Sequence, residues 1–183
     1  MPYPRDIKQK FDDLKSALHS SNRTNLHLKA NGGNTILFIY SPEEEYHYLN
    51  KLKEDYPDGL FIDISQEIVS FLDDITIDTF EQLYKEYGPS RYQLFKSGTN
   101  SDDLFSRVIN RIKEAEQLGK IPFLIRTGAF YGTSIDNHMI MDDKTVRELS
   151  LPLVVFYPAT FIEGNLTYLN FKLSSHYRSQ IIL

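Results

Sequence analysis

Short apolar runs alternate along the chain with stretches whose apolar residues recur at helical spacing. Four of these runs lack the in–out alternation of a half-exposed strand, which indicates strands buried on both faces, as in a parallel sheet. We expect these strands near residues 35–40, 60–64, 122–127 and 152–157. Residues 166–173 do alternate apolar and polar side chains, so they predict a half-exposed strand that can form an antiparallel edge.

Helical patterns fill most of the segments between these runs. Their apolar positions run from Ile7 to Leu18, Tyr46 to Tyr56, Ile68 to Leu72, Phe80 to Tyr87 and Leu104 to Leu118, and a further helix is expected over Lys144 to Leu149. The polar stretch before the first strand is expected to be a loop, with room for a short strand at residues 26–28. Alternating strands and helices predict a single α/β domain over residues 1–183. Its expected architecture is three-layered, with a mostly parallel central sheet of about five strands flanked by helices.

The segment after the first predicted strand, Ser41-Pro42-Glu43-Glu44, matches a capping box at the start of a helix. A nucleotide-binding sheet places a glycine-rich turn here, and the chain has neither of the two common glycine motifs. Three consecutive glutamates complement the helix dipole and would repel a phosphate. We therefore expect a capped helix rather than a nucleotide site at this position.

Composition narrows the choice of function. The 183 residues include 20 Lys and Arg against 25 Asp and Glu, a formal net charge of −5, whereas nucleic-acid-binding domains usually have a basic surplus. The absence of cysteine excludes disulfides, thiolate nucleophiles and cysteine-ligated metals. We find no signal segment and no apolar run of membrane-spanning length, so we expect a cytoplasmic protein without direct nucleic-acid or membrane contact.

Ligands of parallel α/β sheets bind beyond the carboxyl ends of the strands. The loops at this edge are residues 41–44, 63–66, 127–132 and 157–160. Asp63 ends a strand and can meet a ligand there, although a cap on the following helix is the favoured role.

Asp136-Asn137-His138 is the best catalytic-looking cluster, since it contains a base and metal-ligand types. Adjacent residues of a helix diverge by about 100°, however, and the five histidines show no ligand spacing. We therefore predict no catalytic residues, no metal and no cofactor.

Aromatic residues are abundant, with 12 Tyr and 12 Phe. Some belong to the core, but aromatic side chains also dominate protein interfaces. The loop after the third strand, the end of the fourth strand and the tail are the favoured places for such contacts. The candidate partner-binding residues are Phe130, Tyr131, Tyr157, Tyr177 and Arg178. For the loop after the third strand, the alternative of a simple strand-to-helix connection with a packed aromatic residue stays open.

Weak motifs follow one another in a particular order. They are Leu37-Phe38-Ile39-Tyr40-Ser41-Pro42-Glu43-Glu44-Glu45, Phe61-Ile62-Asp63-Ile64-Ser65, Phe123-Leu124-Ile125-Arg126-Thr127-Gly128, Phe156-Tyr157-Pro158-Ala159, His176-Tyr177-Arg178 and Ile181-Ile182-Leu183. This order resembles the BrxB family, small components of BREX bacteriophage-exclusion systems, over about residues 5–183. The chain departs from the family at Ala159, which replaces a glycine, and at His176, which replaces a tyrosine.

The resemblance implies a role in antiviral defence within a protein complex. It also implies the alkaline-phosphatase-like component of the same system as partner, and it implies no catalytic residues. We therefore expect a non-enzymatic component that acts through protein–protein interaction. Two alternatives remain: a small α/β enzyme or ligand-binding domain that uses the loops after the first, third and fourth strands, and a stand-alone scaffold of another pathway.

Overall fold

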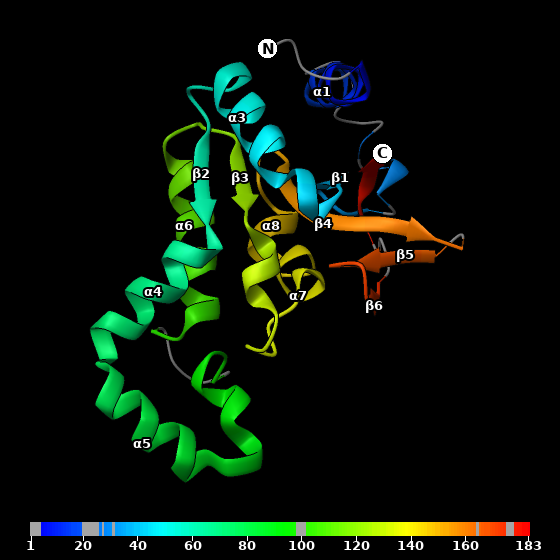
Figure 1. Cartoon of the computed structure of the whole chain (residues 1–183). Coiled ribbons are helices and arrows are strands. Elements are labelled where there is room, and N and C mark those ends of the chain that lie inside the picture. Colours follow the sequence, from blue (N-terminus) through cyan, green and yellow to red (C-terminus); the bar gives the residue numbers. More distant parts are fainter. Residues whose placement is uncertain are drawn as a thin grey trace.

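The computed structural model describes residues 5–19, 26, 28–30, 32–97, 102–163, 165–174 and 178–183. Five parallel strands form the centre of the fold, in the order β2-β3-β4-β1-β7 (Figure 1). Their bounds are β1 Thr35–Tyr40, β2 Leu60–Asp63, β3 Pro122–Ile125, β4 Leu153–Ile162 and β7 Gln180–Ile182. Helices flank this sheet on both faces, which confirms the predicted α/β class and the mostly parallel five-stranded sheet.

The helices follow the predicted order. They are α1 Arg5–Leu18, α3 Glu45–Asp55, α4 Ile64–Ile75, α5 Ile77–Tyr87, α6 Leu104–Gln117, α7 Asn137–Met141 and α8 Lys144–Arg147, with 3-10 turns η2 Pro42–Glu44, η3 Gly88–Leu94 and η4 Thr127–Phe130. Figure 1 shows α5 projecting away from the sheet, and no residue of α5 is buried.

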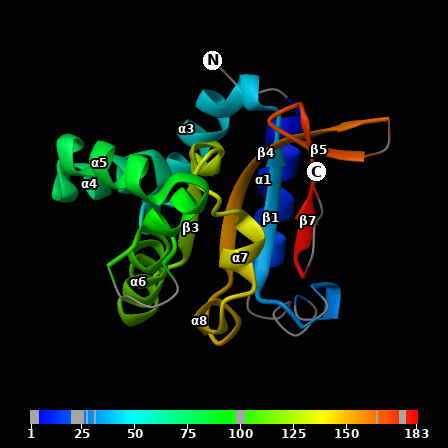
Figure 2. The same cartoon turned by 90° about the horizontal axis from the view of Figure 1, so that it is seen from below.

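One sheet face, called here the closed face, is covered by α1 and α3. In Figure 2, α1 lies alongside β1 and β7, and its apolar stripe belongs to the same buried cluster as these strands. The parallel register pairs Phe38 of β1 with Phe156 of β4, and their rings stack with centroids 4.5 Å apart. Phe11 of α1 and Tyr48 of α3 pack on Phe38 at 5.1 and 5.8 Å. This face is therefore sealed by a continuous aromatic cluster.

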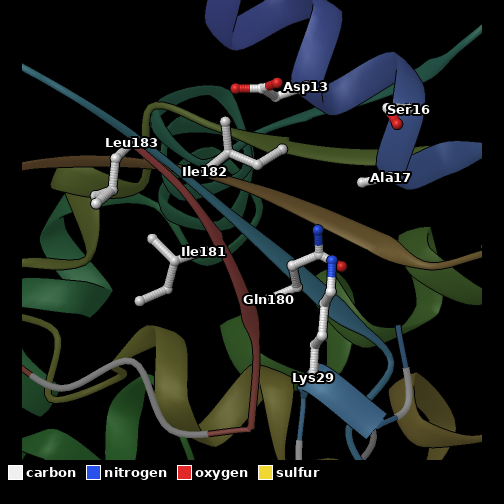
Figure 3. Close-up of a pocket in the computed structure, with 8 residues that line it drawn as sticks. All are labelled: Asp13, Ser16, Ala17, Lys29, Gln180, Ile181, Ile182 and Leu183. Carbon is white, nitrogen blue, oxygen red and sulfur yellow. The ribbon is translucent and has the colours of Figure 1, made fainter. Parts of the chain in front are cut away.

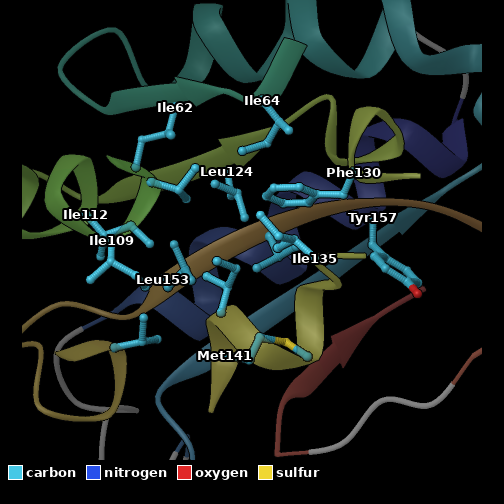
Figure 4. Close-up of a cluster of buried hydrophobic side chains, with 14 of the residues drawn as sticks. Ile62, Ile64, Ile109, Ile112, Leu124, Phe130, Ile135, Met141, Leu153 and Tyr157 are labelled. Carbon is cyan, nitrogen blue, oxygen red and sulfur yellow. The ribbon is translucent and has the colours of Figure 1, made fainter. Parts of the chain in front are cut away.

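The other face, called here the open face, is covered by α4, α6, α7, α8 and η4. Because successive strand residues point to opposite faces, Leu37, Val155 and Tyr157 lie here while their neighbours Phe38 and Phe156 lie on the closed face. Figure 4 shows Leu124 and Leu153 among the aliphatic side chains that helices of this face cover.

The strand predicted over residues 166–173 is interrupted. Residues Asn165–Tyr168 form β5, which pairs antiparallel with the extended end of β4, and Lys172–Leu173 form β6, which pairs with β5. Leu169 and Asn170, with φ of 51° and 64°, make the turn between them. The predicted antiparallel edge is confirmed, but as a hairpin.

Two local expectations are wrong. Leu26 and Leu28 are helical, where a short strand had room to form. The capping box does not form, because Pro42–Glu44 make a 3-10 turn and Ser41 gives no side-chain cap. The favoured role of Asp63 is confirmed: it caps α4, and its carboxylate accepts hydrogen bonds from the Ser65 backbone and hydroxyl at 3.1 and 2.6 Å.

A candidate binding cavity on the open face

A cavity of about 530 Å³ lies on the open face, between the segment that follows β3 and the strands β4, β5 and β6. Its lining comes from β1 and β4, from residues 130–141 and from residues 168–174 of the β5–β6 hairpin. The lining residues are Leu37, Phe130, Tyr131, Gly132, Ser134, Ile135, Asp136, Asn137, His138, Met141, Tyr157, Tyr168, Lys172, Leu173 and Ser174. Figure 4 shows Phe130, Ile135, Met141 and Tyr157 in this part of the fold.

Aromatic side chains form the inner walls of the cavity. Phe130, Tyr157 and Tyr168 are buried, and the rings of the two tyrosines stack with centroids 4.8 Å apart. The Tyr168 hydroxyl donates to the Thr127 carbonyl at 2.6 Å, and the Tyr157 hydroxyl makes a short hydrogen bond with the Ser174 hydroxyl. Since both phenols are already paired, the tyrosines can offer ring surface to a ligand.

Both tyrosines stay neutral at physiological pH. Burial raises the pKa of Tyr157, and burial together with the nearby Tyr157 raises the pKa of Tyr168. A phenol with a raised pKa is a poor source of phenolate. The inner walls therefore provide neither a base nor an oxygen nucleophile.

Asn137 is the buried polar residue of the cavity. Only 5% of its surface is exposed, and its Oδ1 atom has no hydrogen-bond partner among the described residues. Asp136 caps α7 by accepting a hydrogen bond from the Met139 backbone at 3.0 Å, which makes Asn137 the first helical residue. An unpaired acceptor in a protein interior costs about 1–3 kcal/mol, and this oxygen is buried away from the open space of the cavity.

The mouth of the cavity is exposed and mixed in charge. Tyr131 and Leu173 are 61% and 74% exposed, and the charged or titratable side chains are Asp136, His138 and Lys172. His138 Nε2 lies 4.0 Å from the Asp142 carboxylate, while the Asp136 carboxylate serves as the α7 cap. Asp136 therefore serves as a helix cap, and His138 lies close to a different carboxylate, Asp142.

The turn after β3 positions the cavity wall. Arg126 takes a left-handed conformation, with φ of 52°, and the chain continues into η4. The Thr127 hydroxyl donates to the Phe156 carbonyl at 2.8 Å, which ties η4 to β4. These contacts bring Phe130 back onto the open face.

Ion pairs occupy the carboxyl edge of the sheet. The Arg126 guanidinium forms an ion pair with Asp63 at the end of β2, and its Nε lies 3.9 Å from Glu45 at the start of α3. The Tyr40 hydroxyl donates to the other Glu45 oxygen at 2.6 Å. Asp63 therefore serves as helix cap and ion-pair partner, and the candidate site lies beside this edge on the open face.

The residues singled out as partner-binding candidates divide into distinct groups. Phe130 and Tyr157 are buried, so the expectation that Phe130 faces outward is wrong, and both line the cavity. Tyr131 is exposed. Arg178 is half-buried and pairs with Asp142 at 3.0 Å. Tyr177 lies outside the described residues.

Two residues of this region were not singled out from the sequence. The Phe171 ring meets Tyr131 edge-on with centroids 5.2 Å apart, and Tyr168 stacks on Tyr157. Both belong to the 166–173 segment, whose alternation was interpreted only as a strand. The concentration of aromatic residues in this segment is the sequence signal that could have identified Tyr168 and Phe171.

A second hollow, of about 450 Å³, lies between α1 and the edge strand β7 (Figure 3). Its charged lining residues are Asp13 and Lys29. Of the unpaired buried polar side-chain atoms found in the described part of the chain, none belongs to its lining. The open-face cavity is therefore the stronger candidate site.

Comparisons of the chain with protein-family models, curated proteins and solved structures gave no significant match. Within the described ranges, no three His, Asp or Glu side chains cluster closely enough to hold a metal ion. The same ranges contain no helix with the length and apolar character needed to cross a membrane.

Proposed function

We propose that the chain is a non-enzymatic, partner-binding component of a BREX-type antiviral defence system in the cytoplasm. Its proposed partner is the alkaline-phosphatase-like component of the same system. The defence role is supported by the order of sequence motifs that resembles the BrxB family. The binding role is supported by one observation, an exposed apolar surface beside the cavity.

This surface, the aromatic rim, consists of Tyr131, Phe171 and Leu173. Their exposed fractions are 61%, 60% and 74%, and the two aromatic rings contact each other. Large apolar side chains held together at the surface are typical of the anchoring residues of protein interfaces. The rim extends the interaction surface expected at Tyr131 onto the β5–β6 hairpin.

The proposal is tested by pull-down of the alkaline-phosphatase-like protein encoded beside this chain's gene. We expect the double variant Tyr131→Ser/Phe171→Ser to weaken binding by about 30-fold or more, as loss of a hot spot does, while the melting temperature stays nearly constant. Phage-plating assays on cells that carry the variant should show a matching loss of protection.

Tyr46→Ser is the matched control, because Tyr46 is 73% exposed on α3, far along the chain from the rim. Loss of binding in this control but not in the rim variant would place the interface on the acidic α3 region and refute the rim. Salt provides a second readout: binding through an aromatic surface should change little with ionic strength, whereas a charge-led interface weakens markedly. Full binding by both variants, or a gene neighbourhood without phosphatase-like, ATPase and methyltransferase genes, would count against the proposal.

The alternative of a ligand-binding domain is favoured by a different observation, the open-face cavity with its buried aromatic walls. The two functions are compatible. Tyr131 and Leu173 lie at the mouth of the cavity, whereas Phe130, Tyr157 and Tyr168 form its inner walls.

A further inference from the structure

We infer that the projecting arm of the molecule is a docking surface for a basic amphipathic helix of another protein. The arm is defined here as residues 73–94, which comprise the end of α4, the helix α5 and the turn η3. It shares no residue with the open-face cavity or with the aromatic rim. The inference goes beyond the proposed defence role, because it rests only on the exposure, spacing and charge of these residues.

The apolar stripe of α5 is only partly covered by this chain. Ile77, Phe80, Tyr84 and Tyr87 follow the spacing that places residues on one side of a helix. No residue of α5 or η3 is buried, Ile77 is 68% exposed, and Tyr84 and Tyr87 are also exposed. Figures 1 and 2 both show α5 at the far end of the molecule, away from the sheet.

The helix α5 is too short to be stable through its intrinsic propensity alone. Helices of fewer than about 12–15 residues are marginal in water and depend on packing of an apolar face, and α5 has 11 residues. Phe80 supplies part of this packing, since its ring centroid lies 5.9 Å from that of the buried Phe95. Ile77 and Tyr84, two turns apart, stay exposed. A second helix laid along them would add the apolar burial that α5 lacks.

Charge selects the kind of partner. The arm has a net charge of −3 out of −5 for the whole chain, from five acidic and two basic side chains: Asp73, Asp74, Asp78, Glu81, Glu86, Lys85 and Arg91. Asp74 pairs with Arg107 of α6, and Glu81 pairs with Lys85. The other three acidic side chains are exposed and form no ion pair within the described part of the chain.

This acidic excess excludes some occupants and attracts others. A second copy of the chain would bring the same excess, and like charges facing each other across an interface cost free energy. A helix with Lys or Arg beside its own apolar stripe would place opposite charge against Asp73, Asp78 and Glu86. We therefore assign the arm to a basic partner rather than to self-association.

The tyrosines of the arm suit the same partner. Arg91 of η3 lies over the Tyr84 ring, with its guanidinium carbon 4.6 Å from the ring centroid, and donates to the Tyr84 hydroxyl at 3.0 Å. A cation is attracted to the face of an aromatic ring, and arginine makes this contact most often. Tyr87 and Tyr92 are exposed, and neither has a cation over its ring among the described residues. Their faces can receive an arginine or lysine of the docking helix.

The test uses a labelled synthetic peptide of about 14 residues, or about four helical turns. It contains only leucine and lysine, arranged so that the leucines form one helical stripe. A matched peptide has glutamate in place of lysine, and a third has the leucine and lysine residues in scrambled order. Fluorescence anisotropy measures the affinity of each peptide, and hydrogen exchange locates the bound peptide on the protein.

We expect the leucine–lysine peptide to bind and the two matched peptides to bind about tenfold or more weakly. Binding should slow hydrogen exchange in α5. The variant Ile77→Ser/Tyr87→Ser should weaken binding about tenfold, because it removes two anchors of the stripe. Tyr46→Ser/Leu118→Ser is the matched control, since it removes two exposed apolar side chains outside the arm, and it should bind as the wild-type protein does.

A second pair of variants tests the charge. Asp73→Asn/Glu86→Gln removes two charges from the arm, and Asp12→Asn/Asp58→Asn removes two from exposed positions elsewhere, so both variants have the same net charge. The arm variant should bind about threefold or more weakly at low salt, whereas the control variant should change little. This comparison separates local attraction from attraction by the whole acidic protein.

Equal binding of the three peptides, equal weakening by the arm and control variants, or no binding at millimolar peptide would overturn the inference. Sedimentation of the protein alone tests the other occupant: a dimer that is lost in Ile77→Ser/Tyr87→Ser would assign the stripe to a second copy and refute the basic partner. The peptide comparison and hydrogen exchange on wild-type protein decide the matter even if a variant loses α5. None of these outcomes changes the pull-down test of the aromatic rim.

Discussion

The two faces of the sheet bury similar strands in different ways. On the closed face, α1 and α3 pack against paired aromatic residues, and the rings of Phe38 and Phe156 stack at an interplanar angle of 9°. On the open face, α4 and α6 together with shorter helices and turns cover mainly aliphatic side chains, and the cavity lies between η4, α7 and the strands β4, β5 and β6.

The difference follows from how each face is built. Two helices of 14 and 11 residues supply long apolar stripes to the closed face, and large rings fill the space under them. Next to the cavity, η4, α7 and α8 contain only four, five and four residues, so each contributes few inward side chains. The closed face is filled by packed rings, and the open face keeps the cavity beside the aromatic rim.

The largest expected effect is the loss of a ring from the closed face. Phe156→Ala should reduce the free energy of unfolding by about 3–5 kcal/mol, because Phe156 packs against Phe38 and Phe123 and a cavity would replace it. Phe130→Ala removes an equally buried ring that already borders a cavity, so we expect a loss of about 3 kcal/mol or less. Urea unfolding of both variants measures this difference. A larger loss for Phe130→Ala would reverse the assignment of the stabilising face.

An intermediate effect is expected at the start of α6, the longest helix of the open face. Asp103 Oδ1 accepts a hydrogen bond from the Ser106 backbone at 2.8 Å, and Oδ2 accepts one from the Ser97 backbone at 2.7 Å. Asp103→Ala should therefore cost about 1–3 kcal/mol in unfolding free energy. A loss below about 0.5 kcal/mol would show that this cap does not hold the open face together.

The same carboxylate predicts a pH dependence. Burial acts to raise the pKa of Asp103, but the hydrogen bonds from Ser106 and Ser97 outweigh it and lower the pKa. A lowered folded-state pKa gives stability that is present above the unfolded value of about 4 and is lost as the pH falls below it. Urea titrations at neutral and acidic pH should show this loss in the wild-type protein and a smaller loss in Asp103→Ala.

The main strands could be predicted because each contains consecutive apolar residues. Both faces are buried in β1, in β3 and in residues 153–159 of β4, whereas one face of β2 is only half-buried. β7 was missed because it has only three residues, and its pairing with β1 joins segments far apart in the sequence. The capping box failed because the 3-10 turn lets the Ser41 carbonyl accept the hydrogen bond from the Glu44 backbone at 2.9 Å. Such choices depend on local geometry that residue types alone do not determine.

The candidate site was only partly predictable, for a related reason. The loop after β3 and the cluster at residues 136–138 were both singled out, and both line the cavity. The cavity itself is formed by segments far apart in the sequence that meet only in the folded chain, a tertiary property with no sequence signal. Phe130 and Tyr131 are adjacent in sequence, yet one is buried and the other exposed.

The smallest expected effect on stability is at the aromatic rim. Tyr131→Ala and Phe171→Ala should each change the free energy of unfolding by no more than about 0.5 kcal/mol, as most exposed substitutions do. The edge-on contact of the two rings, at an interplanar angle of 87°, should give a coupling of about 0.5 kcal/mol in a double-mutant cycle.

The small expected change in unfolding free energy distinguishes the rim residues from the buried residues on both faces of the sheet. A loss above about 1.5 kcal/mol in either single variant would mean that the rim supports the hairpin, so weaker partner binding in the same variant would report unfolding rather than contact. If the loss stays within the expected range, weaker binding of the same variant in the pull-down reports lost contact with the partner.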